Sequence, residues 1–178
     1  SDQTATSAAI HFEDMLDPAL LGVAVGLKSG VAPAVVEAAV FEELDRLLAD
    51  GDTLPLGNLV IEAWQTPGHT PACLTYVVQS DKETVAFVGD TLFMPDYGTA
   101  RCDFPGGDAA MLYRSIQRIL ALPADTRIFV GHDYLPAGRN TPAWESSVAA
   151  QRDTNIHIGG GIDEAAFVAM RDARDKTL

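Results

Sequence analysis

The chain has 178 residues, of which 47% are hydrophobic, and its 25 acidic residues outnumber 12 Lys and Arg to give a formal net charge of −13. A chain of this length can enclose one hydrophobic core, so we expect a single domain over residues 1–178. The negative charge argues against nucleic acid and anionic membrane surfaces as partners. No apolar run reaches the roughly 18–20 residues of a membrane span, and the N-terminus lacks the basic start of a signal peptide. We therefore expect a cytoplasmic protein.

The first part of the chain has strand patterns and one helical pattern. Residues 7–10 favour a short strand, and the apolar run over residues 20–27 predicts a buried strand. Pro33 suits a first helical turn, and apolar residues then recur at helical spacing until Gly51. This pattern predicts a helix that faces the core.

Two hairpins follow the predicted helix. Thr53–Leu56 and Leu59–Gln65 are separated by a Gly-Asn turn, and Leu74–Gln79 and residues 84–88 are separated by a polar turn. The next stretch, residues 94–107, has no periodicity. A loop of that length in a small domain is usually functional or mobile, and its position after Gly89-Asp90 favours the functional option.

The rest of the chain is mainly helical. Asp108 suits the N-cap of a helix over residues 109–122, and residues 127–130 predict a strand. Thr141-Pro142 is predicted to open a helix that runs to about Asp153, and Asp163 to cap a helix that runs to the C-terminus. His157 lies in a Gly-rich link and is interpreted as a loop residue. A β-rich half followed by strand, helix and strand indicates an α/β sandwich.

Three polar residues follow predicted strands, each directly after a glycine. His69 lies in Thr66-Pro67-Gly68-His69-Thr70-Pro71, Asp90 in Gly89-Asp90-Thr91, and His132 in Gly131-His132-Asp133-Tyr134. Each residue alone is more often an ordinary turn residue. Together, two imidazoles and a carboxylate at strand ends are suited to binding a transition metal.

These motifs resemble the later metal motifs of the metallo-β-lactamase superfamily. The loop over residues 96–108 is similar to that of the persulfide dioxygenase, or sulfur dioxygenase, branch. It is most similar to bacterial β-lactamase-like hydrolases encoded with sulfide-responsive repressors and rhodaneses. The resemblance runs from about Leu20 to the C-terminus and implies an αββα sandwich, apparently missing the segment that carries the first metal motif.

The resemblance also implies a set of ligands. One Fe(II) per chain is expected, with His69 and Asp90 as ligands and a further histidine from a His-x-His-x-Asp-His motif upstream. The chain lacks this motif, because His11 is the only histidine before His69. His132 matches the ligand that other members use for a second metal, and in dioxygenases it lies beside the iron. We expect that segments of a longer polypeptide are absent near residues 18–20 and after residue 178.

The implied activity is oxidation of glutathione persulfide, or another small persulfide, by O₂ to sulfite in sulfide detoxification. Arg101 resembles a residue that reaches the substrate or braces its loop, and a salt bridge to Asp103 is the alternative. Tyr134 is expected either to donate a hydrogen bond near the site or simply to pack. A rhodanese-type sulfurtransferase and a second copy of the chain are the expected protein partners.

Two other functions are compatible with the same residues. A zinc-dependent thioester hydrolase of the glyoxalase II type would use His132 as a full ligand and Zn²⁺ to activate a water molecule. A chain that truly lacks its first ligands would instead be a metal-free, non-catalytic fragment. Cys73 and Cys102 are too few for a disulfide framework, and Cys102 is interpreted as either reactive or merely tolerated.

Overall fold

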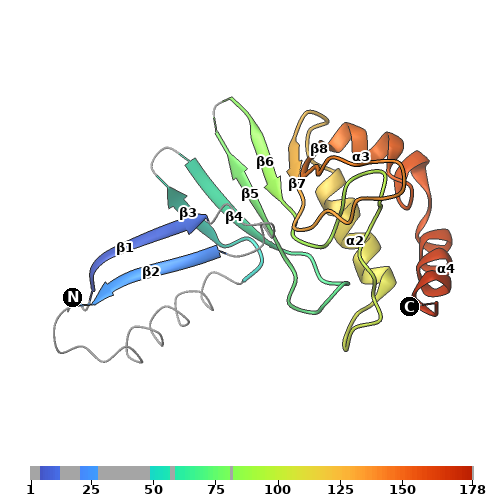
Figure 1. The fold of residues 1–178 in the computed structure, drawn as a ribbon, viewed down its shortest axis with the longest axis horizontal. Helices are drawn as coiled ribbons and strands as arrows, with labels where there is room; N and C mark the ends of the chain where they lie inside the picture. The colour runs from blue at the N-terminus through green and yellow to red at the C-terminus, as the bar shows by residue number, and fades with distance from the viewer. Residues whose placement is uncertain (1–4, 13–20, 28–48, 57–58, 81, 178) are drawn as a thin grey trace.

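The computed structural model describes residues 5–12, 21–27, 49–56, 59–80 and 82–177 (Figure 1). Strands β1 (Ala5–Phe12) and β2 (Leu21–Leu27) form an antiparallel two-stranded sheet. Both strands lie where the sequence predicted them. The helix predicted from Pro33 lies outside the described residues up to residue 48, and so does the expected seam near residues 18–20.

A six-stranded sheet forms the centre of the molecule. Its strands lie in the order β3 (Thr53–Leu56), β4 (Leu59–Gln65), β5 (Leu74–Gln79), β6 (Thr84–Phe87), β7 (Arg127–Phe129) and β8 (Glu145–Ser147). Neighbouring strands are antiparallel except for β6 and β7, which are parallel. A parallel pair requires a crossover connection, so the chain leaves β6 and β7 at the same edge of the sheet.

Helices cover one side of this sheet (Figure 1). They are α2 (Ala109–Leu120), α3 (Val148–Thr154), a short 3₁₀ turn η1 (Gly159–Gly161) and α4 (Glu164–Asp175). Helix α2 lies in the crossover between β6 and β7, and α4 packs against α2. The Asp108 side chain accepts a hydrogen bond from the Met111 amide (2.8 Å), which confirms the predicted N-cap.

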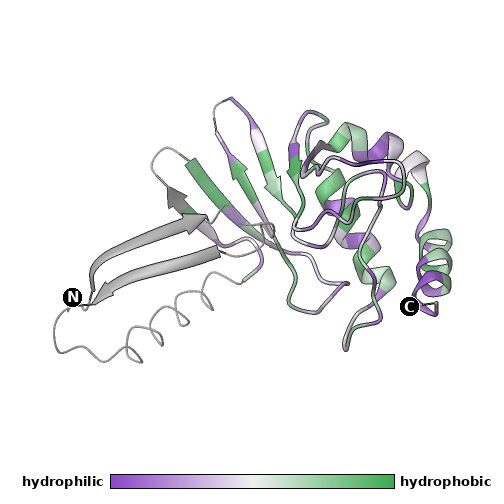
Figure 2. Ribbon diagram, viewed as in Figure 1, coloured by the Kyte–Doolittle hydropathy of each residue, from purple (hydrophilic) through white to green (hydrophobic). Residues whose placement is uncertain are grey.

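The core lies between the sheet and the helices. Figure 2 shows hydrophobic residues on the central strands and along α2. Fully buried apolar side chains from both layers meet there: Val77, Ala86, Val88, Leu112, Ile116, Ile119, Ile128, Val148 and Phe167. The helix predicted over residues 109–122 thus packs its apolar side chains onto the sheet. Its burial holds the crossover against the sheet, and the crossover carries the long loop that surrounds the site described below.

The prediction of a helix that opens at Thr141-Pro142 is wrong over its first half. Residues 145–147 instead form β8, which pairs antiparallel with β7. The Arg127 guanidinium donates to both Glu145 carboxylate oxygens (2.6 and 3.0 Å) and thereby reinforces the pairing. The helix starts only at Val148, where the Ser147 hydroxyl caps it by accepting from the Ala150 amide. Contacts with β7 thus outweighed the local helical signal.

None of the helices in the described ranges has the length and apolar character needed to cross a membrane.

Candidate functional site

The turn that carries His69 packs tightly against α2. The Gly68 carbonyl oxygen accepts a hydrogen bond from the Asp108 amide (2.8 Å). Gly68 has φ +138°, and a Cβ atom at this position would lie 2.3 Å from the Leu112 Cα. A side chain at residue 68 would therefore push the turn away from α2, which explains the glycine before His69.

A hydrogen bond to the backbone orients the His69 ring. Its Nδ1 lies 2.7 Å from the Arg101 carbonyl oxygen. Because a carbonyl oxygen can only accept, Nδ1 carries the proton and Nε2 carries the lone pair. Nε2 lies 3.9 Å from the Asp90 Oδ2 atom. Metal-binding histidines are commonly oriented in this way, with one ring nitrogen donating to a carbonyl and the other available to a cation.

Asp90 and His132 follow the two parallel strands. The Gly131 amide donates to the Gly89 carbonyl oxygen (2.9 Å), so the ladder between β6 and β7 continues up to these two residues. Next to this bond, His132 Nδ1 lies 2.5 Å from Asp90 Oδ1. The structure thus brings His69, Asp90 and His132 together at one edge of the sheet, as the sequence indicated. Their role as metal ligands stays a prediction.

The donors in this cluster are of the types that bind iron or zinc. His69 Nε2 is an imidazole nitrogen with an available lone pair, and Asp90 supplies a carboxylate. His132 directs Nδ1 toward Asp90 instead. Across the described part of the chain, no three His, Cys, Asp or Glu side chains are arranged to hold a metal ion. The described residues therefore offer two oriented ligands, His69 and Asp90, and His132 lies beside them.

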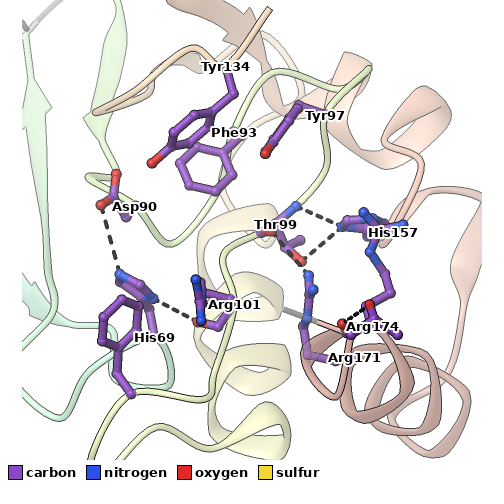
Figure 3. A pocket seen from close by; sticks show the side chains of 12 residues that line it. His69, Asp90, Phe93, Tyr97, Thr99, Arg101, Tyr134, His157, Arg171 and Arg174 are labelled. Carbon is purple, nitrogen blue, oxygen red and sulfur yellow. Dashed lines mark hydrogen bonds and ion pairs between the residues drawn. The ribbon is translucent and has the colours of Figure 1, made fainter. Parts of the chain in front are cut away.

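A pocket of about 500 Å³ opens in front of His69 and Asp90 (Figure 3). Aromatic rings line one side of it. Tyr134 stacks on Tyr97 (5.0 Å between ring centroids) and on His132 (5.8 Å), and Phe93 meets Tyr134 edge-on at 5.2 Å. The structure thus shows the packing role foreseen for Tyr134, and the alternative role, a hydrogen bond near the site, stays a prediction.

Arg101 also lines the pocket. Its guanidinium forms a two-pronged ion pair with the Asp103 carboxylate and lies over the Phe104 ring, 5.1 Å from the centroid. This pairing raises the pKa of Arg101 and lowers the pKa of Asp103. The salt bridge foreseen as an alternative for Arg101 is therefore present, and contact with substrate stays a prediction.

Arg139 connects the two loops that carry the aromatic rings. Its guanidinium pairs with Asp96 (2.7 Å) in one loop and with Asp133 (2.5 Å) in the other. Asp133 also accepts a hydrogen bond from the Ala143 amide (2.7 Å). The hydrogen bond from Arg139 lowers the pKa of the Asp133 carboxyl. Charged contacts thus hold the loop next to His132 in place.

The opposite wall of the pocket is formed by His157, Arg171 and Arg174 (Figure 3). His157 is only 6% exposed, and its Nδ1 accepts a hydrogen bond from the Thr99 amide (2.9 Å). The ring proton is therefore on Nε2, for which no acceptor is found among the described residues. Burial, followed by the charges of Arg174 and Arg171, lowers the pKa of His157 to about 4, so the ring is neutral at pH 7.

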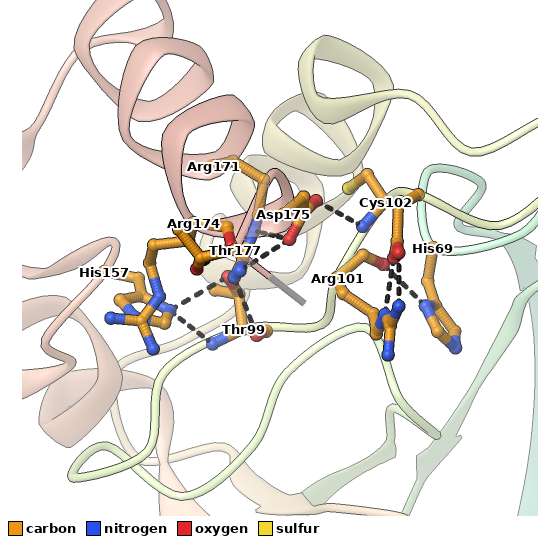
Figure 4. A network of polar contacts seen from close by, with 10 residues as sticks. His69, Thr99, Arg101, Cys102, His157, Arg171, Arg174, Asp175 and Thr177 are labelled. Atoms are coloured by element: carbon orange, nitrogen blue, oxygen red, sulfur yellow. Dashed lines mark hydrogen bonds and ion pairs between the residues drawn. The ribbon is translucent and has the colours of Figure 1, made fainter.

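A chain of polar contacts links α4 to His69 (Figure 4). The buried Arg171 guanidinium pairs with Asp175 (2.8 Å), and Asp175 Oδ2 accepts from the Cys102 amide (2.8 Å). Cys102 follows Arg101, whose carbonyl oxygen orients the His69 ring. Burial and the Asp175 charge raise the pKa of the Cys102 thiol to about 12. Of the two interpretations of Cys102, the structure therefore favours an inert thiol.

Comparison with known proteins identifies the family. The sequence profile of the metallo-beta-lactamase superfamily matches residues 15–132. The chain belongs to the metallo-β-lactamase superfamily. Among solved structures of this superfamily, ETHE1 from Myxococcus xanthus superposes with a TM-score of 0.60 at 30% identity, covering 71% of this chain and 51% of that chain. This likeness confirms the predicted fold class.

Metallo-β-lactamase relatives of several kinds are similar to the chain. A probable metallo-hydrolase of Burkholderia pseudomallei is 59% identical over 76% of this chain and 48% of its own length. A hydroxyacylglutathione hydrolase of a Methylobacterium species is 42% identical, covering 58% of this chain and 38% of the relative. The human mitochondrial persulfide dioxygenase ETHE1 is 39% identical, covering 52% of this chain and 35% of the relative. The chain thus spans less than half the length of each of these relatives.

The sequence missed one wall of this metallo-β-lactamase pocket. His157 was interpreted as a loop residue and does lie in a turn, but its burial against Thr99 was not foreseen. Arg171 and Arg174 were not singled out, although their spacing of three residues on a predicted helix places them on neighbouring positions of its surface. Nothing in the sequence indicates that this helix meets the turn that carries His157.

Proposed function

We propose that the protein is an iron-dependent persulfide dioxygenase that oxidises glutathione persulfide, or a similar small persulfide, to sulfite. The observation that carries this proposal is a pocket with His69 Nε2 and Asp90 at one end and arginines along its other walls. Three arginines line this pocket, although the chain has only 12 Lys and Arg and a net charge of −13. Asp103 and Asp175 pair with Arg101 and Arg171, so within the described residues it is the charge of Arg174 that favours an anionic thiol compound. The similarity to the human persulfide dioxygenase ETHE1 supports the same substrate class.

The residues at the sheet edge would hold the metal. His69 and Asp90 would be ligands, and the upstream His-x-His-x-Asp-His motif implied by the family resemblance would complete the set. Fe(II) held by two imidazoles and a carboxylate supplies open coordination positions for the persulfide sulfur and O₂. The hydrogen bond from His132 to Asp90 would keep the carboxylate in one orientation.

The proposed reaction balances without a further reductant. A persulfide RSSH reacts with O₂ and water to give the thiol RSH and sulfurous acid. The S–S bond breaks, the outer sulfur loses four electrons to the two oxygen atoms, and the released thiolate takes up a proton. The rings of Phe93, Tyr97 and Tyr134 would limit the access of water from one side of the site.

The test uses the full-length natural polypeptide. Denaturing mass spectrometry first establishes its mass, and metal analysis then counts iron and zinc. We expect a mass well above 18.9 kDa, one iron per chain, and equal amounts of O₂ consumed and sulfite formed from glutathione persulfide. A mass of 18.9 kDa with no bound metal would instead indicate the non-catalytic fragment.

A second candidate is a zinc-dependent thioester hydrolase of the glyoxalase II type. The observation that favours it is the position of His132, 2.5 Å from Asp90, because a hydrolase of this type would use His132 as a further metal ligand beside the carboxylate. The similarity to a hydroxyacylglutathione hydrolase points in the same direction. Two zinc ions per chain, hydrolysis of S-lactoylglutathione and no O₂ uptake would favour the hydrolase over the dioxygenase.

A further inference from the structure

The Arg139 side chain uses every N–H donor that it has. Nε and Nη2 donate to the two Asp96 carboxylate oxygens (2.7 and 3.2 Å). Nη1 and Nη2 donate to the two Asp133 oxygens (2.5 Å each), and Nη1 donates its second hydrogen to the Thr141 carbonyl oxygen (3.1 Å). A guanidinium has five N–H donors, and each has an acceptor here. The side chain is therefore fixed in one position, because moving it breaks several charge-assisted hydrogen bonds.

The loop that carries Arg139 is closed on itself by Asp133. Asp133 Oδ2 also accepts from the Ala143 amide (2.7 Å), so the two ends of this loop are joined. Within the loop, Leu135 has a left-handed conformation (φ +46°), which a residue with a side chain keeps only where its surroundings fix it. The ion pair between Arg139 and Asp96 is thus a contact that a preformed loop makes with the separate loop over residues 94–99.

This ion pair lies next to the aromatic wall of the pocket, which consists of Phe93, Tyr97 and Tyr134 (Figure 3). Asp96 precedes Tyr97 in one loop, and Asp133 precedes Tyr134 in the other. The two tyrosine rings stack on each other at 5.0 Å between centroids, and Phe93 meets Tyr134 edge-on at 5.2 Å. One guanidinium therefore ties together the two loops whose rings form the wall.

We propose that Arg139 is a positioning residue that keeps the aromatic wall closed beside Asp90 by tying the loop of Tyr97 to the loop of Tyr134. A closed wall of stacked rings limits the access of water to the reacting groups. The effect of Arg139 on turnover rests on the proposed function. Its hold on the two loops does not, because the contacts that form it are independent of the metal and the substrate.

The tie depends on charge, so it has a signature in salt. In the wild type a cation lies between the carboxylates of Asp96 and Asp133, and salt weakens this attraction. In Arg139→Gln the same two carboxylates remain without the cation, and salt weakens their repulsion. The Asp96 side chain is 46% exposed, so ions can reach the pair. Added KCl should therefore loosen the two loops in the wild type and bring them together in Arg139→Gln.

The test measures hydrogen exchange of residues 94–99 by mass spectrometry in the full-length protein without substrate. The Tyr97 and Gly98 amides donate to the Met94 carbonyl oxygen within this loop, so their exchange reports its opening. In the wild type, exchange should become faster when KCl is raised from about 0.1 M to about 1 M, which shortens the screening length from roughly 10 Å to roughly 3 Å.

Two variants separate the parts of the tie. Asp96→Asn removes the contact between the loops and keeps the pair of Arg139 with Asp133, so exchange should be faster by about two- to fivefold, as for a half-exposed ion pair. Arg139→Gln removes both pairs, so exchange should be faster by about 10- to 100-fold. Salt should slow exchange in Arg139→Gln and have no effect in Asp96→Asn.

Arg127→Gln is the matched control, because Arg127 also joins two carboxylates, those of Glu145 (2.6 Å) and Glu83 (3.3 Å). Arg127 begins β7, whereas His132 follows the other end of this strand, so the control changes the sheet edge away from the pocket. It should leave the exchange of residues 94–99 unchanged. An equal acceleration in this control would overturn the proposal.

The tie is also refuted if exchange in Asp96→Asn matches the wild type, or if salt speeds exchange in Arg139→Gln as it does in the wild type. If Arg139→Gln does not fold, the salt effect is read from Asp96→Asn, where its disappearance is the expected result and its persistence refutes the tie.

Turnover separates a positioning role from a purely structural one. At saturating persulfide, kcat for sulfite formation should fall by about tenfold in Arg139→Gln, less than the roughly 100-fold that misplaced reacting groups can cost, and should recover in part in KCl. Iron content should not change. Faster exchange with an unchanged kcat would overturn the positioning role. Faster exchange in the variants of a protein whose wild type forms no sulfite would retain the tie and refute the proposed function together with the effect of Arg139 on it. Sulfite formation with unchanged exchange would retain the function and refute the tie.

Discussion

The two walls of the pocket are built in different ways. The sheet-edge wall takes His69 and Asp90, with His132 beside them, from short turns that follow strands, and hydrogen bonds bring these turns together. The α4 wall takes its residues from a loop, a turn and a helix that meet only through tertiary packing. The polar residues of the sheet-edge wall thus lie at strand ends that the pairing of β6 with β7 brings together, whereas those of the α4 wall depend on how α4 docks.

The largest loss of metal binding and activity is expected at the sheet edge. Asp90→Ala removes a proposed metal ligand, so iron content should fall to background. Activity should fall by more than ~100-fold. Substitution of residues that only hydrogen-bond to metal ligands already lowers metal affinity or activity by about 10–100-fold. Metal analysis and sulfite production measure these losses, and circular dichroism should show an intact fold. Asp153→Ala, at an exposed position of α3, is the control. Full iron occupancy in Asp90→Ala would refute the ligand assignment.

The largest loss of stability is expected at the α4 wall. Asp175→Asn leaves the buried Arg171 without a charged partner, and the free energy of unfolding should fall by about 3–5 kcal/mol. Glu164→Gln removes the partner of Arg114, whose side chain is 66% exposed, and should lower the free energy of unfolding far less, because solvent screens a surface ion pair. Urea unfolding measures both variants. Similar losses in the two would mean that the Arg171 pair is no more important than a surface contact.

A smaller loss of stability is expected when a methyl group is added at Gly98, which packs against His157. Gly98→Ala and Gly138→Ala both place a side chain on a residue with positive φ, +104° and +98°. At Gly138 the new atom meets nothing within 4 Å, whereas at Gly98 it lies 2.1 Å from His157 Nδ1. Gly98→Ala should therefore lower the free energy of unfolding by about 1–3 kcal/mol more than Gly138→Ala. Thermal unfolding compares the two, and equal shifts would show that His157 can move aside.

The last effect is a dependence of stability on pH. Folded His157 has a pKa of about 4, below the 6.5 of an unperturbed histidine, so the unfolded chain binds more protons between these values. The contribution of His157 to stability is therefore complete above pH 6.5 and is lost as the pH falls toward 4. Urea unfolding between pH 4.5 and 7 should show a shallower slope for His157→Asn than for the wild type. Identical slopes would contradict a buried, neutral His157.

The sequence predicted the sheet-edge wall because its signals are local. A glycine, a polar residue and a preceding apolar strand are visible within a few residues of His69 or Asp90. The strands β1 to β7 and the helices α2 and α4 were found for the same reason. The start of α3 was misplaced because pairing between β8 and β7 is a long-range contact. His157 and Arg174 were missed because they lie in different elements, and only the packed structure brings them to one pocket.

The parallel pairing of β6 and β7 has a consequence for folding. Asp90 and His132 are 42 residues apart in sequence, and the intervening chain includes the whole of α2. Closing so long a loop is entropically costly until the crossover helix has packed, and contacts of this kind form slowly. The pair should therefore assemble late in refolding, after α2 has formed. A metal-sensitive spectroscopic signal would then report the last step of folding rather than the first.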